Sequence, residues 1–371
     1  MSYYILPKNY NNICINPISS NSFSYTPYVS CTLYNYYNDI REQIINILNN
    51  TDLSYNTFEE IVKIVNPYEY IFSKVPGSKF SVSKLKPKTN LFYDFLEVSR
   101  CLNIFDKFKD RSINTLHITI NNKDTVECFE MQREGFIDNI IYYDNLNEEI
   151  IQNISDNKFD MLFFETDELC SHKYIYELLQ FTMIILKNQS NEGTTIIKIN
   201  SIFYKPIVDI LYLFTSLFES VYIIKPNASN ITTFDKYIVC KNFIYNENKI
   251  NQYKINYFKI YFFLKKLENN YITSIFDYEL PYYFISKIDD MNVTIGQQQL
   301  ESLDQIINIL KNKNKDDKIE NIKKTNIQKS VSWCEKYKIP CNKFTDKINI
   351  FLPIMKELEI EVESEQELHN I

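Results

Sequence analysis

Short apolar runs alternate with amphipathic stretches through the middle of the chain. GTTIIKI (Gly193–Ile199) is a β-branched run typical of a buried strand, SVYIIKP ends a second at Pro226, and KYIVCKNF (Lys236–Phe243) is a third. Between the first two, Pro206 opens a stretch whose apolar residues recur on one helical face. A strand, a covering helix and a returning strand form the unit of doubly wound α/β folds, and the pattern predicts that class.

The same alternation extends toward the N-terminus, and helical patterns flank it on both sides. We expect further strands over residues 91–99, 116–120, 136–143 and 159–165, and helices over 34–50, 57–65 and 174–186. After residue 251 the character changes to long helical pieces, and a glutamate-rich stretch begins at Lys356. The predicted organisation is an N-terminal arm with a helical extension (1–90), an α/β domain (91–250) and a helical C-terminal region with an acidic tail (251–371).

Composition excludes several classes of function. The net charge of −7 over 371 residues means that any nucleic-acid contact needs a local basic patch. Four glycines that never cluster exclude a P-loop or a G-x-G-x-x-G phosphate loop. Eight cysteines without a C-x-x-C pair and three histidines exclude most zinc modules, and we predict no metal site. No apolar run reaches the length of a membrane helix and no signal peptide is evident, which predicts a soluble, intracellular protein.

The stretch from Glu192 to Phe243 resembles the C-terminal half of FtsJ-type RNA ribose 2′-O-methyltransferases. The shared features are a glycine, an apolar strand that carries Lys198, a proline-opened helix, SLF-x-x-V-x-I-x-KP, and YIVC. The likeness is closest to viral and eukaryotic mRNA cap methyltransferases, and the abundance of residues with AT-rich codons suggests a large DNA virus. The resemblance implies a Rossmann-like S-adenosylmethionine methyltransferase sheet with N-terminal and C-terminal helical additions.

The resemblance also implies a catalytic set. In the family, a Lys–Asp–Lys–Glu tetrad orients and deprotonates the ribose 2′-hydroxyl. Lys198 matches the central lysine. Lys84, in SVSKL, matches the first, although a solvated basic turn over residues 79–88 is an equally open interpretation. Glu165, which ends FDMLFFE, stands where the family has aspartate. Asp235, two residues before YIVC, stands where it has glutamate. The two acidic side chains therefore differ in length from those of the family.

The cofactor motif departs further from the family. Its pattern resembles F-L-D-L-x-x-x-P-G-G-F, and the aligned stretch here is Phe95–Phe105, in which Leu-Asn-Ile replaces Pro-Gly-Gly. Side chains in place of the glycines narrow the space for the methionine end of S-adenosylmethionine. The positions that the resemblance assigns to this cofactor are Glu97, Ser99, Asn103 and Phe105.

Two functions remain open from the sequence. One is an active, S-adenosylmethionine-dependent mRNA cap 2′-O-methyltransferase with a divergent first motif. The other is a non-catalytic relative that keeps the fold to bind RNA or a protein partner, such as a capping or polyadenylation subunit, in viral mRNA modification. The altered first motif favours the second, and Asn230, which replaces an RNA-holding arginine of the family, weakens the case for RNA contact at that position.

Overall fold

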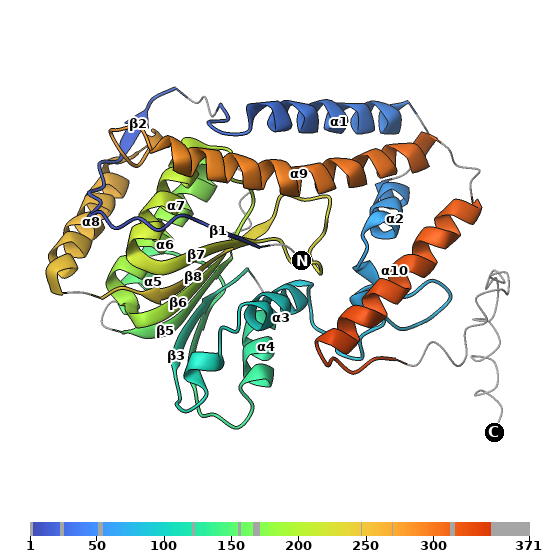
Figure 1. Ribbon diagram of the computed structural model, residues 1–371, viewed down its shortest axis with the longest axis horizontal. Helices are drawn as coiled ribbons and strands as arrows, with labels where there is room; N and C mark the ends of the chain where they lie inside the picture. Colours follow the sequence, from blue (N-terminus) through green and yellow to red (C-terminus); the bar gives the residue numbers. More distant parts are fainter. Residues whose placement is uncertain are drawn as a thin grey trace, which may run out of the picture.

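A seven-stranded β-sheet lies at the centre of the computed structural model of this chain (Figure 1). Four neighbouring strands run parallel, in the order β4 (Asn139–Tyr143), β3 (Asn114–Ile118), β5 (Phe159–Glu165) and β6 (Gln189–Ile199). Three antiparallel pairings complete the sheet through β8 (Lys236–Phe243), β7 (Phe218–Ile224) and β1 (Tyr3–Ile5). The structure describes residues 3–22, 26–50, 55–120, 123–154, 157–165, 171–245, 247–268, 270–311 and 316–342.

Helices cover both faces of the sheet, which confirms the predicted doubly wound α/β class. One face packs against α6 (Ser171–Asn188), α7 (Lys205–Leu217), α8 (Glu247–Lys266) and the first half of α9 (Tyr282–Lys311). The other packs against α3 (Leu91–Cys101), α4 (Asp124–Gln132) and the end of α10 (Asp316–Lys336). Three short helices connect these elements, namely η1 (Glu69–Ile71), η2 (Asp106–Phe108) and α5 (Glu148–Asn153).

The N-terminal and C-terminal additions pack on one another. The helix α1 (Cys31–Asn49) lies along α9, as Figure 1 shows, and Leu33 contacts it at Gly296. A Cβ atom on Gly296 would lie 2.4 Å from the Leu33 Cδ2 atom, so this crossing requires a glycine. The helix α2 (Tyr55–Val65) joins α9 and α10 in a separate apolar cluster, and β2 (Ile18–Ser20) pairs with β9 (Tyr271–Ser274).

One predicted strand is wrong. Residues 91–99 (LFYDFLEVS) form most of α3 rather than the first strand of the sheet. All nine of these residues are buried, the polar Asp94, Glu97 and Ser99 included, so no exposed face marks a helical period. Periodicity cannot separate a buried strand from a buried helix in so short a run. The parallel part of the sheet therefore begins at β3, and the turn over residues 102–105 follows a helix and not a strand.

The other main expectations are confirmed. The strands over 116–120, 136–143, 159–165 and 193–199 and the helices over 34–50, 57–65 and 174–186 all occur, within a few residues. The short strands β1, β2 and β9 were not predicted. Within the described ranges, no helix is both long and apolar enough to cross a membrane. The predicted acidic tail from Lys356 lies outside the described residues.

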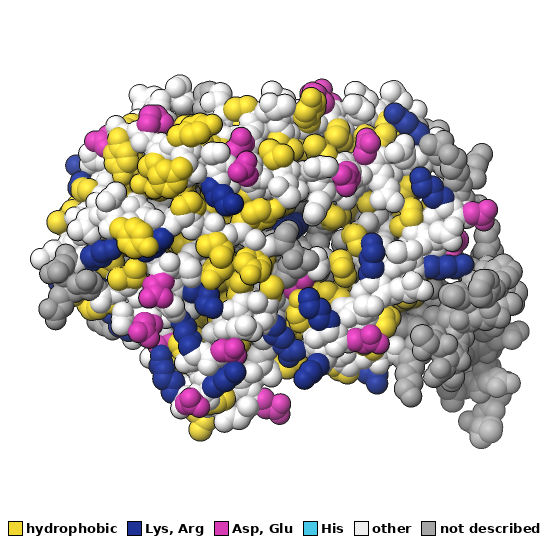
Figure 2. Space-filling model, in the orientation of Figure 1, with side chains coloured by type: hydrophobic (Ala, Val, Ile, Leu, Met, Phe, Trp, Pro, Cys, Tyr) yellow, Lys and Arg dark blue, Asp and Glu magenta, His cyan; other side chains and the backbone are white. Residues whose placement is uncertain are grey.

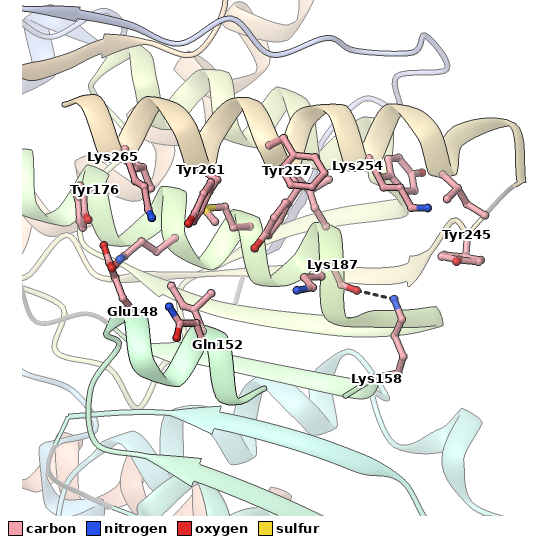
Figure 3. A pocket seen from close by; sticks show the side chains of 18 residues that line it. Glu148, Gln152, Lys158, Tyr176, Lys187, Tyr245, Lys254, Tyr257, Tyr261 and Lys265 are labelled. Atoms are coloured by element: carbon pink, nitrogen blue, oxygen red, sulfur yellow. Dashed lines mark hydrogen bonds between the residues drawn. The ribbon is translucent and has the colours of Figure 1, made fainter. Parts of the chain in front are cut away.

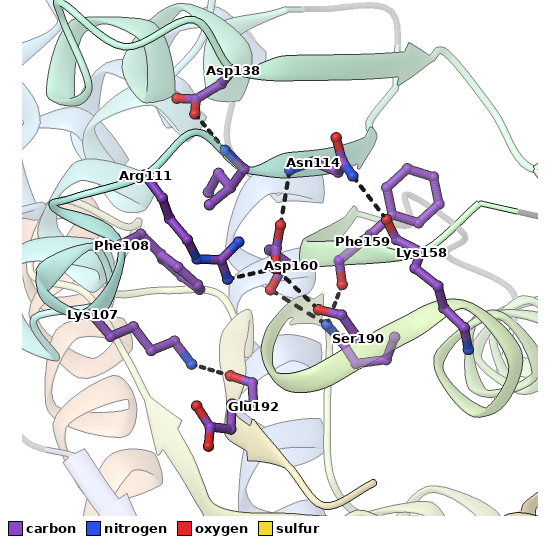
Figure 4. A network of polar contacts seen from close by, with 12 residues as sticks. Lys107, Phe108, Arg111, Asn114, Asp138, Lys158, Phe159, Asp160, Ser190 and Glu192 are labelled. Atoms are coloured by element: carbon purple, nitrogen blue, oxygen red, sulfur yellow. Dashed lines mark hydrogen bonds and ion pairs between the residues drawn. The ribbon is translucent and has the colours of Figure 1, made fainter.

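A buried carboxylate joins three strands where the parallel sheet begins (Figure 4). Asp160, near the start of β5, accepts hydrogen bonds from the backbone N–H of Asn114 at 3.0 Å and from the Ser190 hydroxyl at 3.2 Å. The Arg111 guanidinium pairs with the same carboxylate at 2.8 Å. These contacts align the amino ends of β3, β5 and β6, and the register that they set carries through to the opposite ends of the strands.

An uncharged histidine is buried in the parallel part of this sheet. His117 on β3 is fully buried, its ring stacks on Phe163 with centroids 6.0 Å apart, and its Nδ1 atom lies 2.9 Å from the Thr125 hydroxyl. Burial lowers the pKa of this imidazole to about 3. The folded protein therefore holds His117 neutral over the whole range in which an exposed histidine takes up a proton.

We expect the free energy of unfolding to fall as the pH drops below about 6.5, because the unfolded chain protonates this imidazole and the folded chain does not. At pH 4.5 the loss from His117 alone is about 2–3 kcal/mol. Urea unfolding of the native chain and of His117→Phe between pH 7.5 and 4.5 tests this, since phenylalanine keeps the apolar ring without the proton. Equal losses of stability in both proteins would contradict it.

Candidate functional site

The carboxyl ends of the parallel strands form the edge at which sheets of this class hold ligands. The strand order reverses between β3 and β5, because β3 leads to β4 on one side and β5 leads to β6 on the other. A crevice outside the strand ends is expected at such a reversal. The site residues predicted from the sequence can therefore be judged by whether they reach this edge.

Lys198 and Glu165 meet at this edge as an ion pair. They are register partners on β6 and β5, and the Lys198 Nζ atom lies 2.8 Å from the Glu165 Oε1 atom. Their side chains are 20% and 10% exposed, so water screens the pair only in part. The other carboxylate oxygen of Glu165 is buried and accepts no hydrogen bond from the residues that the structure describes.

Two further carboxylates act on Lys198. Asp235 directly precedes β8, and because β8 runs antiparallel to β6 its first residues lie where β6 ends. Asp94 of α3 accepts hydrogen bonds from the Ser229 hydroxyl at 2.8 Å and the Tyr237 hydroxyl at 2.9 Å. Burial by itself would lower the pKa of Lys198, but Glu165, Asp235 and Asp94 together raise it above its ordinary value.

The cluster contains residues that the sequence did not indicate. Burial raises the pKa of the Asp94 carboxyl to about 6, against the opposing effect of Lys198. Lys225 at the end of β7 donates to the Thr233 carbonyl at 3.0 Å, and burial lowers its pKa while Asp235 opposes the shift. A cavity of about 290 Å³ adjoins the cluster and is lined by Tyr68, Lys225, Ser229 and Gln298, among others.

A neighbouring lysine belongs to the other face of the sheet. Lys236 follows Asp235 and is 1% exposed, and burial, together with repulsion from Lys225, lowers its pKa to about 7. Successive strand residues point to opposite faces, and Tyr237, not Lys236, is the register partner of Lys198. The lysine with the lowered pKa is therefore directed away from the ion pair.

Lys84 is not joined to this cluster. Its side chain is exposed, its backbone N–H donates to the Pro340 carbonyl at 2.8 Å, and the preceding Ser83 forms a bridge with Cys341. Among the contacts between described residues, none connects Lys84 with Glu165, Lys198 or Asp235. Three of the four residues of the predicted catalytic set thus come together, and their catalytic roles stay a prediction.

Of the four residues predicted for the cofactor, Glu97 and Ser99 are buried, Phe105 is half-buried and Asn103 is exposed. Glu97 accepts hydrogen bonds from the Ala228 N–H and the Trp333 indole N–H, both at 3.0 Å, and burial raises its pKa. Ser99 donates to Gln132, Asn103 lies in the left-handed region with a φ of 48°, and the Phe105 ring packs against Phe95 and Phe129. The strand end at which these residues were expected does not exist, because α3 takes its place.

The segment that follows β3 in the sequence, residues 119–123, is the next candidate for a cofactor loop, and its Asn121 and Asn122 lie outside the described residues. It reads Thr-Ile-Asn-Asn-Lys and contains no glycine. Glycines let the backbone approach a bound cofactor closely, and this loop offers none. The residues present therefore do not fit the glycine-lined approach of S-adenosylmethionine in the resembled family. Among the described residues, no group of three or more His, Cys, Asp or Glu side chains is placed to hold a metal ion.

Comparison with known proteins adds only distant structural likenesses. No family model and no curated protein matches the chain. A crystal structure described as a ribosomal RNA methyltransferase from Plasmodium falciparum is 16% identical, covers 43% of this chain and 100% of its own, and has a TM-score of 0.31. An S-adenosylmethionine-dependent methyltransferase from Clostridium acetobutylicum is 13% identical, covers 45% of this chain and 80% of its own, and has a TM-score of 0.19.

We expect Lys198→Met to destabilise the protein by about 2–4 kcal/mol, because it leaves the Glu165 carboxylate buried without its cation. The double variant Lys198→Met/Glu165→Gln should recover part of this loss, since it removes both charges. Urea unfolding of the native chain, both single variants and the double variant measures the coupling. Lys63→Met, at an exposed position of α2, should change stability by less than about 0.5 kcal/mol, and an equally small effect of Lys198→Met would contradict the assignment.

Proposed function

We propose that this chain is a non-catalytic member of the RNA 2′-O-methyltransferase lineage that acts in viral mRNA cap modification by binding RNA or a protein partner. The observation that carries the proposal is the state of Lys198. A lysine that serves as a general base needs a pKa lowered toward neutrality. Three carboxylates instead raise the pKa of Lys198, so that it keeps its proton.

Two further observations support a loss of catalysis. The loop after β3 has no glycine, so it does not fit S-adenosylmethionine in the way that the resembled family does. The second lysine that would help to lower the pKa of Lys198 is not supplied by Lys84, whose contacts lie with residues 340 and 341. The assignment to viral capping, and to a capping or polyadenylation subunit as partner, rests on the sequence resemblance.

In this proposal the ion-pair cluster has a structural role. Lys198, Glu165, Asp235 and Asp94 hold the ends of β5, β6 and β8 against α3, and these contacts remain useful after the chemistry is lost. Glu97 extends the same contact to α10 through Trp333. A sheet edge fixed in this way offers a rigid surface for a partner.

An active cap 2′-O-methyltransferase is the second candidate. The observation that favours it is the meeting of Glu165, Lys198 and Asp235 at one strand edge, as the tetrad of the resembled family requires. In this case Lys198 would lie against the ribose 2′-hydroxyl, and the carboxylates would hold the lysine in place. Lys225, which interacts with Asp235 and Lys198, could then provide the second cation.

Calorimetric titration of the native chain with S-adenosylmethionine separates the two candidates. We expect no saturable binding, and no transfer of methyl groups to capped RNA. Binding gained by Asn121→Gly/Asn122→Gly would locate the defect in the loop after β3. Saturable binding by the native chain, together with methyl transfer that Lys198→Met abolishes, would overturn the proposal in favour of the enzyme.

A further inference from the structure

A groove of about 710 Å³ lies between α5, α6 and α8, in the helical layer on the opposite face from α3 (Figure 3). One end is bounded by Lys158, which precedes β5, and by Tyr245, which follows β8. These positions correspond to the amino end of β5 and the carboxyl end of the antiparallel β8. This end of the groove is therefore at the edge of the sheet opposite to the Lys198–Glu165 pair, whereas Tyr176, near the start of α6, lines the other end.

Tyrosines form one wall of this groove. Tyr257 and Tyr261 project side by side from α8 toward α5 and α6, as Figure 3 shows. Their rings are nearly parallel, with an interplanar angle of 7° and centroids 6.3 Å apart. Both side chains are partly exposed, while Tyr176 and Tyr245 line the two ends of the row. The wall thus presents two nearly parallel aromatic rings beside one another, with the Lys265 Nζ atom 4.6 Å from the centroid of the Tyr261 ring.

Lysines surround these rings. Lys158, Lys187, Lys254 and Lys265 line the groove, and Glu148 is the one acidic side chain among its described lining residues, so the local net charge is +3 in a chain whose overall charge is −7. The Lys187 Nζ atom lies 5.5 Å from the centroid of Tyr257. Elsewhere Figure 2 shows Lys and Arg interspersed with Asp and Glu, whereas here one sign of charge predominates.

Two polar features of the groove could meet a bound ligand, although the Lys158 ammonium already donates to the Lys187 carbonyl at 2.6 Å. Lys158 and Lys187 lie close enough to repel one another, and burial together with this repulsion lowers the pKa of Lys158. An anion between them would relieve the repulsion. The side chain of Gln180 also lines the groove and is 5% exposed. Its amide has both a donor and an acceptor for a bound polar edge.

We propose that this groove binds single-stranded nucleic acid, with bases stacked on Tyr257 and Tyr261 and phosphates held by the surrounding lysines. Grooves that bind single strands without strict sequence preference combine these two elements, because each base has a face for stacking and each phosphate carries a negative charge. The amide of Gln180, which lines the groove, supplies a hydrogen bond to a base edge. An acidic protein segment would use the lysines but would leave the parallel rings without a matching surface.

The inference does not depend on the proposed function. It requires neither S-adenosylmethionine nor an RNA cap, and it concerns the groove between α5, α6 and α8 rather than the Lys198–Glu165 pair. The test is the fluorescence anisotropy of labelled, uncapped 12-nucleotide RNA titrated with the full chain, in parallel with DNA of the same sequence. Comparison of the two titrations shows whether the groove binds RNA and DNA with different affinities.

We expect saturable binding that weakens with salt. For single strands, the logarithm of the binding constant falls by about 0.7 per neutralised phosphate for each unit of log salt concentration, so Lys254→Ala should reduce the slope by about 0.7. Tyr257→Leu/Tyr261→Leu should weaken binding by roughly 10- to 100-fold, since it removes both stacking faces. Tyr257→Phe/Tyr261→Phe keeps the rings and should bind like the native chain.

Matched controls lie on other elements. Lys63→Ala on α2 and Tyr282→Ala at the start of α9 remove an exposed lysine and an exposed tyrosine outside the groove, and both should bind like the native chain. Thermal unfolding of each variant checks that it is folded, and Lys254→Ala remains informative if the leucine variant is not. The proposal is overturned if the native chain does not bind RNA, or if the groove variants bind RNA as the native chain does. It is also overturned if polyglutamate displaces the RNA and binds the native chain and the Tyr257→Leu/Tyr261→Leu variant with equal affinity.

Discussion

The buried ammonium group of Lys198 is the constraint on which the architecture of this sheet depends. A charge at that depth costs several kcal/mol unless carboxylates surround it, and three elements supply them: Glu165 on β5, Asp235 before β8 and Asp94 on α3. A slip of one residue between β5 and β6 would direct Lys198 to the opposite face of the sheet. The carboxylates surround Lys198 only when the strand register, the direction of β8 and the position of α3 are those observed.

Much of this arrangement could be predicted from local pattern. The strand of Lys198, the helix opened by Pro206 and the strands on either side of Asp235 carry clear signals of β-branched runs and helical periodicity. The predicted meeting of Glu165 and Lys198 follows from two neighbouring parallel strands that end in a charged residue. For such pairs, the residue pattern and the topology together determine which side chains meet.

What could not be predicted lies in contacts between distant segments. Asp94 and Glu97 stand three residues apart on α3, and their partners are Ser229, Tyr237 and Trp333, more than 130 positions along the chain. In the sequence, Asp94 and Glu97 interrupt a run that is otherwise mostly apolar, and this pattern is equally compatible with a strand. Tertiary packing decides in favour of the helix, because both carboxylates then point to donors that satisfy them. The misassigned cofactor loop follows directly from this one error.

The Lys198–Glu165 pair and the Lys158 end of the groove lie at opposite edges of the same sheet. β5 links them, since Lys158 precedes it and Glu165 ends it, and a seven-residue strand spans about 23 Å. A small ligand cannot touch both, whereas a single strand of nucleic acid that continues past the groove can. The cations at the ion-pair edge are already neutralised by carboxylates, while the lysines of the groove face one glutamate. For the proposed binding of a single strand, the lysines of the groove therefore offer more uncompensated positive charge than the ion-pair edge does.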